Sequence, residues 1–125
     1  MMNNRDNLIS IIVPCYNEEH AIPYFYKAIT EHSTLMKNEF GVDFEYLFIN
    51  DGSVDNTLTV LKEYASKDNR VKYISFSRNF GKESAMYAGL KNASGNYIAI
   101  MDADLQDPPY LLTEMYKTII ESDYD

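Results

Sequence analysis

Two aspartates stand one residue apart directly after an apolar run of the chain. Asp102 and Asp104 follow residues 97–101, Tyr-Ile-Ala-Ile-Met, whose lack of polar alternation predicts a strand buried on both faces of a parallel sheet. If the backbone stays extended there, both carboxylates point to the same side at the carboxyl end of the strand, where open α/β sheets bind ligands. Two close carboxylates repel each other unless a cation lies between them. Their oxygens suit Mg²⁺ or Mn²⁺, which fill their remaining positions with water and substrate phosphates, so the pair predicts a metal-bridged diphosphate site.

A purely structural role fits the same pair equally well, because Asp is common at helix caps and in loops. Two other polar clusters carry the same ambiguity. Asp51 precedes Gly52 after the apolar run 44–49 and suits a ring N–H of a nucleobase, although an Asp before glycine is more often a turn residue. Residues 77–82 place Arg78 and Lys82 at a predicted helix N-terminus, which favours phosphate, while a solvated basic loop is the alternative.

A third cluster, Pro-Cys-Tyr-Asn-Glu, follows the first apolar run of the chain. Pro14 has no N–H to give to a strand pairing, so we expect it to end the strand and turn the chain outward. Tyr16 and Glu18 would then lie exposed near the same sheet edge, and Tyr16 offers a flat face for a nucleobase. Cys15 has no histidine nearby in the sequence and is predicted to be a small buried side chain.

Four strand–helix units position these clusters. Mainly apolar runs predict strands over residues 8–13, 44–49, 71–76 and 97–101. Apolar residues at helical spacing predict helices around residues 22–36, 58–65, 83–93 and 111–120. Strands that alternate with helices form right-handed crossovers, so we expect a mainly parallel sheet in a three-layer α/β/α fold. Residues 123–125 follow the last helix where a further strand would begin.

Length and composition limit the number of domains and the kinds of partner that the chain can have. A chain of 125 residues with 46% hydrophobic residues supports one domain with a single core. The net charge of −8 argues against nucleic acid and anionic membrane surfaces as partners. The single cysteine excludes an internal disulfide and fits a reducing compartment. Because no apolar run approaches the roughly 18 residues of a membrane span, we expect a soluble, cytoplasmic piece.

Spacing excludes several other kinds of site. A Walker phosphate loop needs a glycine five residues before Gly81, where Phe76 stands, and no G-x-G-x-x-G follows the first strand. His20 and His32 are too far apart to form a two-histidine metal pair on one helical face. A receiver-type phosphoacceptor domain wants an acidic pair after the first strand, and a sugar-nucleotide nucleotidylyltransferase wants a glycine-rich loop there; Pro14 and Cys15 provide neither.

Taken together, four motifs resemble those of the family 2 glycosyltransferases of the GT-A fold. They are residues 13–18, 50–57, 78–82 and 102–109. The chain looks most like the polyprenyl-phosphate (dolichol- or undecaprenyl-phosphate) hexosyltransferase branch, because Asp-Leu-Gln-Asp-Pro-Pro extends the last motif. The resemblance covers about residues 8–116. One departure is Tyr110, which stands where family members often carry an acidic residue.

The resemblance implies a role for each matching residue. Asp51 would accept a hydrogen bond from the base, and Lys82 would lie near the base or the phosphates. Asp102 would reach the ribose or the metal, Asp104 would hold Mg²⁺ or Mn²⁺ on the diphosphate, and Gln106 would face the sugar or the acceptor. The implied nucleotide-sugar site consists of Pro14, Tyr16, Glu18, Asp51, Arg78, Lys82, Asp102, Ala103, Asp104 and Gln106.

The implied activity is that of an inverting hexosyltransferase with a UDP- or GDP-sugar donor and a polyprenyl-phosphate acceptor. A relative acting on a polysaccharide or cell-surface glycan, and a non-catalytic nucleotide- or metal-binding module, are the alternatives. We expect residues 1–125 to be the nucleotide-sugar-binding part of a longer GT-A domain. The catalytic base, the acceptor residues and any membrane contact would then lie beyond Asp125, with the full-length parent at the cytoplasmic face of the membrane. This piece alone is expected to bind nucleotide without transferring sugar.

Overall fold

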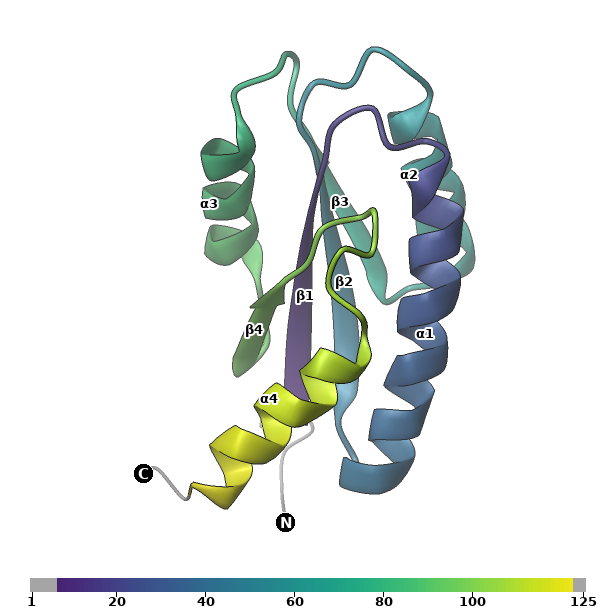
Figure 1. Cartoon of the computed structure of the whole chain (residues 1–125). Coiled ribbons are helices and arrows are strands. Elements are labelled where there is room, and N and C mark those ends of the chain that lie inside the picture. The colour runs from purple at the N-terminus through teal and green to yellow at the C-terminus, as the bar shows by residue number, and fades with distance from the viewer. Residues whose placement is uncertain (1–6, 123–125) are drawn as a thin grey trace.

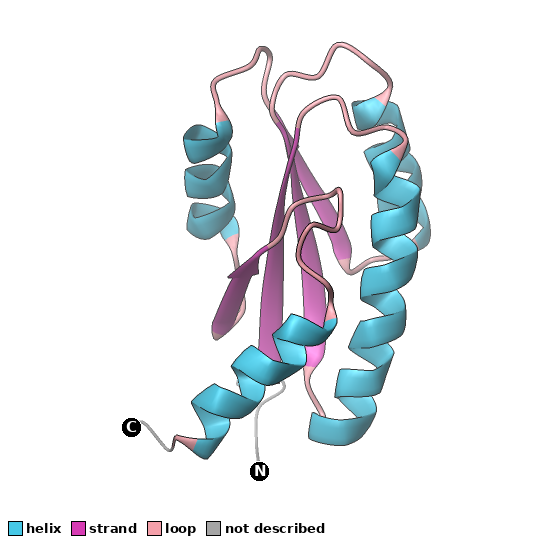
Figure 2. Cartoon of the chain, viewed as in Figure 1, coloured by secondary structure: helices cyan, strands magenta, loops and turns pink. Residues whose placement is uncertain are grey.

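The chain folds into a four-stranded sheet with helices on both faces (Figures 1 and 2) in a computed structural model that describes residues 7–122. In chain order the elements are β1 (Leu8–Cys15), α1 (Ala21–Phe40), β2 (Asp43–Asn50), α2 (Thr57–Lys67), β3 (Val71–Ser75), α3 (Lys82–Asn92), β4 (Tyr97–Ile100) and α4 (Tyr110–Glu121). The strands lie in the order β3-β2-β1-β4, and every pairing is parallel. The predicted alternation and the parallel sheet are confirmed. The expected further strand at residues 123–125 lies outside the described residues.

The sheet separates two apolar layers of unequal size. Helices α1, α2 and α4 pack on one face, where Phe25, Leu61 and Tyr116 meet the inward side chains of β1 and β2. Helix α3 covers the other face alone (Figure 1), and its Ala85 packs with Ile12 of β1. Both central strands are therefore buried on both faces, as a continuous apolar run predicts. Within the described residues, no helix is both long and apolar enough to cross a membrane.

Helix α3 packs against the sheet through a glycine. A Cβ atom placed on Gly89 would come within 2.4 Å of the Cγ2 atom of Ile12. The absence of a side chain at this position therefore lets α3 pack directly on β1, as the small residues of this helix predict. Since α3 begins with Lys82, this packing also fixes the distance of that residue from the sheet edge.

Strand β4 differs from the expectation that both of its faces are buried. Within residues 7–122 it is one of the two edge strands, and Ile98 and Ile100 remain 42% and 37% exposed. Their face is the one that α3 covers over β1 and β2, while the opposite face of β4 presents Ala99 and Tyr97 to Tyr116 of α4. An uninterrupted apolar run indicates a strand but does not indicate its place in the sheet.

Strand β1 also runs two residues beyond the predicted end, through Pro14 to Cys15. The Cys15 carbonyl accepts a hydrogen bond from the Asp51 N–H at 2.8 Å on the β2 side. Because backbone groups alternate in direction along a strand, the Pro14 nitrogen faces the β4 side, where pairing has already ended at Ile12. Pro14 thus removes no hydrogen bond from the sheet, and β1 reaches its edge intact.

A buried carboxylate links three strands at the amino-end half of the sheet, on the face that α3 covers. Glu45 of β2 is 4% exposed, and its carboxylate accepts hydrogen bonds from the Ser10 hydroxyl at 2.5 Å, the Ser94 N–H at 2.6 Å and the Lys72 ammonium at 3.0 Å. Burial raises the pKa of Glu45, but these three donors and the charge of Lys72 outweigh it, so the pKa lies below its ordinary value. Glu45 therefore joins β1, β2, β3 and the α3–β4 turn.

We predict that Glu45→Gln destabilises the chain at neutral pH by on the order of 2–3 kcal/mol, because all three partners of the carboxylate are donors and an amide offers only one acceptor oxygen. A carboxylate with a lowered folded pKa stabilises the fold above its unfolded pKa, about 4.3, and loses that effect as pH falls through the folded value. The difference in unfolding free energy from the native chain, measured by urea titration, should be full at pH 7 and shrink below about pH 4.

Glu39→Gln provides the matched control. Glu39 is an exposed side chain 3.8 Å from Lys117, and such surface pairs contribute at most about 1 kcal/mol. Equal losses in both variants, or a Glu45→Gln deficit that grows in acid, would contradict the assigned role of Glu45.

Candidate functional site

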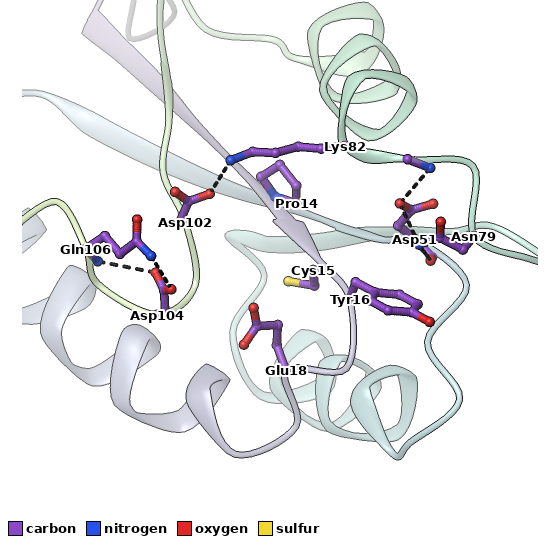
Figure 3. A pocket seen from close by; sticks show the side chains of 11 residues that line it. Pro14, Cys15, Tyr16, Glu18, Asp51, Asn79, Lys82, Asp102, Asp104 and Gln106 are labelled. Carbon is purple, nitrogen blue, oxygen red and sulfur yellow. Dashed lines mark hydrogen bonds and ion pairs between the residues drawn. The ribbon is translucent and has the colours of Figure 1, made fainter.

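The loops that follow the four strands enclose one pocket at the carboxyl edge of the sheet (Figure 3), with a volume of about 560 Å³. This volume lies within the range of small-molecule sites. The pocket is lined by Pro14, Cys15, Tyr16, Glu18, Asp51, Asn79, Gly81, Lys82, Asp102, Asp104 and Gln106. The structure therefore brings together every predicted site residue except Arg78 and Ala103.

These two residues lie elsewhere. Ala103 is 2% exposed and packs in the larger core. The guanidinium of Arg78 lies over the ring of Phe80, 4.8 Å from its centroid, and is not part of the described pocket lining.

Three lining residues were not among the predicted site residues. Cys15 was expected to be a buried packing residue, and it is 1% exposed while its edge still reaches the pocket. Asn79 and Gly81 lie between Arg78 and Lys82, in the segment that its two cations and the N–H groups of a helix N-terminus predict to bind phosphate. Their position between two cations directly before a helix is the signal that could have identified them.

Asp51 holds the β3–α3 loop in place. Its carboxylate is buried and accepts hydrogen bonds from the Phe80 N–H at 2.7 Å, the Gly81 N–H at 3.0 Å and the Asn79 side-chain amide at 3.1 Å. An ionised carboxylate has about four acceptor positions, so one remains for a ligand. The predicted contact with a nucleobase stays a prediction, and the contacts in the structure make Asp51 a positioning residue for Gly81 and its neighbours.

Gly52 allows the same two loops to touch. A Cβ atom at this position would lie 2.1 Å from the carbonyl carbon of Arg78, and Gly52 has a φ of +67°, in the left-handed region. The contact is with backbone, which has no freedom to swing aside. The Asp51–Gly52 pair is therefore a turn, which was the alternative to a ligand-binding role. It also brings the β2–α2 loop into backbone contact with the β3–α3 loop.

The β1–α1 loop is tied to the β2–α2 loop by side-chain hydrogen bonds. The Asn17 N–H donates to the Ser53 hydroxyl, and the Asn17 side-chain oxygen accepts from the Val54 N–H, both at 2.9 Å. Asn17 adopts a left-handed conformation with a φ of +54°, which asparagine tolerates. This arrangement leaves Tyr16 48% exposed, with its ring at the pocket wall as predicted.

The loop after β4 is a turn and not the extended segment that we expected. The Leu105 N–H donates to the Asp102 carbonyl at 3.3 Å, and Leu105 has a φ of +59°. Both carboxylates nevertheless line the pocket, because the turn replaces the strand in directing them to it. Asp102 accepts from Lys82 at 2.8 Å, and Asp104 accepts from the side-chain amide of Gln106 at 2.9 Å (Figure 3).

Negative charge accumulates at this end of the pocket. Burial raises the pKa of Glu18, and the charges of Asp104 and Asp102 raise it further. The hydrogen bond to Asp102 raises the pKa of Lys82, so this lysine remains a cation. The side chains of Glu18, Asp102 and Asp104 therefore share a small region in which a cation is favoured.

The donor set at this end suits a hard divalent cation. Asp102, Asp104 and Gln106 offer carboxylate and amide oxygens, the ligands that Mg²⁺ and Mn²⁺ prefer. Within residues 7–122, no three His, Cys, Asp or Glu side chains form a cluster that could hold an ion by themselves. Mg²⁺ is usually bound by one or two carboxylates, with water and substrate phosphates completing its shell, and the residues present fit that pattern.

The pocket thus has two chemically different ends (Figure 3). Tyr16, Asp51 and Asn79 present an aromatic face and polar groups at one end, whereas Asp104 and Gln106 lie at the other. Such a pocket is arranged to hold an elongated ligand with a flat polar ring at one end and an anionic group, bridged by a cation, at the other.

Comparison with known proteins agrees with this arrangement. The model of the family described as glycosyl transferase family 2 matches residues 10–125. A bactoprenol glucosyl transferase of Shigella phage SfV is 49% identical over 100 residues, which are 80% of this chain and 31% of that protein.

Two solved structures share the fold. TarS 1–349 of S. aureus in complex with UDP-GlcNAc has a TM-score of 0.67 at 29% identity, over 90% of this chain and 31% of that one. The mannosyltransferase PcManGT of Pyrobaculum calidifontis, in complex with GDP-Man and Mn²⁺, has a TM-score of 0.70 at 22% identity, over 89% and 31%.

The sequence therefore spans about a third of the length of the curated relatives that it matches. Within that span the match to the family model begins in β1 and includes all four loops of the pocket. The chain belongs to glycosyl transferase family 2.

Proposed function

We propose that this chain is the nucleotide-sugar-binding part of an inverting hexosyltransferase. The observation that supports the proposal best is the convergence of Tyr16, Lys82 and Asp104 from three different loops on one pocket at the carboxyl edge of the sheet. A UDP- or GDP-sugar carries the flat polar base and the diphosphate that the two ends of this pocket suit. The family membership and the ligands bound in the TarS and PcManGT structures support the same class of donor.

In the proposed complex the base stacks on Tyr16 and the diphosphate lies toward Asp104. Asp102, Asp104 and Gln106 would hold Mg²⁺ or Mn²⁺, which when bound supplies positive charge where the leaving diphosphate becomes more negative. Lys82 contributes further positive charge at the same end. Glu18 faces these carboxylates and helps to exclude anions that arrive without a cation.

The proposed reaction is a single displacement. An acceptor oxygen attacks the anomeric carbon of the sugar as the bond from that carbon to the diphosphate oxygen breaks, which inverts the configuration. A phosphate acceptor is already anionic and needs less help from a general base than an alcohol does. The part of the protein that binds the acceptor is proposed to lie outside residues 1–125.

We further propose a polyprenyl phosphate as the acceptor. The support is the 49% identity to a protein named bactoprenol glucosyl transferase, together with the Asp-Leu-Gln-Asp-Pro-Pro sequence at residues 104–109. A lipid acceptor and a nucleotide-sugar donor would place the whole protein at the cytoplasmic face of a membrane.

Binding of nucleotide by the chain is the direct test of the proposed site. UDP or GDP with Mn²⁺ should raise the free energy of unfolding, by about 2.7 kcal/mol when the ligand is at 100 times its dissociation constant. The thermal shift should require the metal and should shrink in Asp104→Asn, which removes one charged oxygen ligand. The measurement is thermal unfolding with each nucleotide, with and without Mn²⁺.

Asp43→Asn is the control, because Asp43 lies at the amino end of β2 and pairs with Lys37 on the surface. It should keep the full nucleotide shift. A shift that needs no metal, or one that Asp104→Asn leaves unchanged, would refute the role of Asp104.

Tyr16→Ala should weaken nucleotide binding about tenfold, since stacking of a base on an aromatic ring contributes about 1–3 kcal/mol. Tyr16→Phe, which keeps the ring, should stay close to the native affinity. Tyr24→Ala removes a tyrosine that is 75% exposed on α1, outside the described pocket lining, and should leave the nucleotide affinity unchanged. Calorimetric titration with UDP or GDP measures all three, and equal affinities for Tyr16→Ala and Tyr24→Ala would rule out a base at Tyr16.

The acceptor class is tested on the full-length parent protein. With radiolabelled UDP- or GDP-hexose and Mn²⁺, undecaprenyl phosphate should become labelled and be recovered in the organic phase, and Asp104→Asn should abolish the label. Transfer to a soluble glycan, with none to the lipid, would support the polysaccharide-directed alternative.

A further inference from the structure

Lys82 and Asp102 form an ion pair across the pocket, with the ammonium nitrogen 2.8 Å from a carboxylate oxygen (Figure 3). Lys82 is the first residue of α3, whereas Asp102 follows β4, so the pair joins the start of α3 to the loop after β4. Lys82 is the one basic side chain among the described residues that line the pocket, and the acidic ones are Glu18, Asp51, Asp102 and Asp104. One lysine therefore faces several carboxylates and has a choice of partners.

The backbone at both ends of this pair is fixed, but the lysine head is not. The Asp51 carboxylate accepts from the N–H of Gly81, which directly precedes Lys82. The N–H of Met101, which directly precedes Asp102, donates to the Ile12 carbonyl at 2.9 Å. The Lys82 side chain is 58% exposed and consists of a flexible four-carbon stem. The ammonium group can thus leave Asp102 and reach another anion in the same pocket without any movement of the fold.

We propose that Lys82 is an internal counter-ion for Asp102, which a divalent cation displaces and which then pairs with the diphosphate of the incoming nucleotide. The inference rests on the proposed function and concerns the regulation of that same site. Its consequence is that metal and nucleotide bind together, each promoting the other, and that the metal alone binds weakly.

Charge balance gives the reason for this coupling. A divalent cation alone must break the Lys82–Asp102 pair and leave the ammonium group without a partner. A diphosphate alone meets the carboxylates of Glu18 and Asp104. When both enter, the cation pairs with Asp102 and the diphosphate pairs with Lys82, so neither member of the former ion pair is left without an opposite charge. The coupling must be reciprocal, because both ligands act on one binding equilibrium.

The test is to measure Mn²⁺ binding to the chain by the loss of the free-ion signal in electron paramagnetic resonance, without nucleotide and then with saturating UDP. Binding of Mn²⁺ to UDP itself is measured in parallel without protein. In Lys82→Met, Mn²⁺ alone should bind about fivefold more tightly than in the native chain, because it no longer competes with an ion pair of that strength. The factor by which UDP strengthens Mn²⁺ binding should fall by roughly fivefold or more.

Two variants separate this role from a general loss of charge or of structure. Lys82→Arg keeps a cation beside Asp102 and should retain the weak binding of Mn²⁺ alone and most of the coupling. Lys91→Met removes an exposed lysine in the last turn of the same helix and should behave as the native chain in both titrations.

The outcomes distinguish this inference from the proposed function. If the native chain binds Mn²⁺ and UDP together but Lys82→Met leaves the affinity for Mn²⁺ alone unchanged or lower, the counter-ion role is wrong and the nucleotide site stands. If neither the native chain nor any variant binds Mn²⁺ or UDP, both proposals fail. Tighter binding of Mn²⁺ alone with weaker coupling, in Lys82→Met only, supports the inference.

Discussion

One buried carboxylate determines the shape of the pocket. Asp51 directly follows β2 and accepts hydrogen bonds from two backbone N–H groups and one side-chain amide of the β3–α3 loop. Hydrogen bonds to a charged group stabilise by about 1.5–3 kcal/mol each. They hold the loop at the start of α3, where Lys82 is directed at Asp102 (Figure 3). A single side chain directly after one strand thus helps to place a cation that belongs to another element.

Much of this fold follows from the sequence because apolar runs and helical periodicity report burial directly. β2 shows the pattern at its clearest, since Phe44 to Ile49 are all buried. The place of a strand within the sheet is a different kind of information. The apolar residues Tyr97 to Met101 predict a central strand, yet within residues 7–122 β4 lies at one edge of the sheet and Ile98 is exposed. An apolar run does not indicate how many neighbouring strands a strand has. Pro14 shows the complementary case, in which a residue that ends most strands is tolerated because its nitrogen faces a side without pairing.

The candidate site was predictable to the level of loops but not of side-chain directions. Parallel strands deliver their carboxyl ends to one edge, so residues after β1, β2 and β4 had to meet there. Whether a side chain in those loops faces the pocket depends on local turns. Ala103 turns into the core and Arg78 packs on Phe80, although both belong to motifs that otherwise line the pocket. Asp51 lines the pocket and also holds the β3–α3 loop through three donors, a second role that the residue type alone does not reveal.

The charge of the pocket resolves an apparent conflict between composition and function. A chain with a net charge of −8 is repelled by anions, and this pocket adds carboxylates where an anionic diphosphate is proposed to bind. Attraction at such a site cannot come from the long-range field of the protein, so it must come from charges within a few ångströms, where screening by salt is weakest. Without a ligand, Lys82 balances one carboxylate, and a divalent cation is proposed to supply the remaining positive charge at this end of the pocket. An acidic surface and an anion-binding pocket are therefore compatible, provided that the anion brings its own cation.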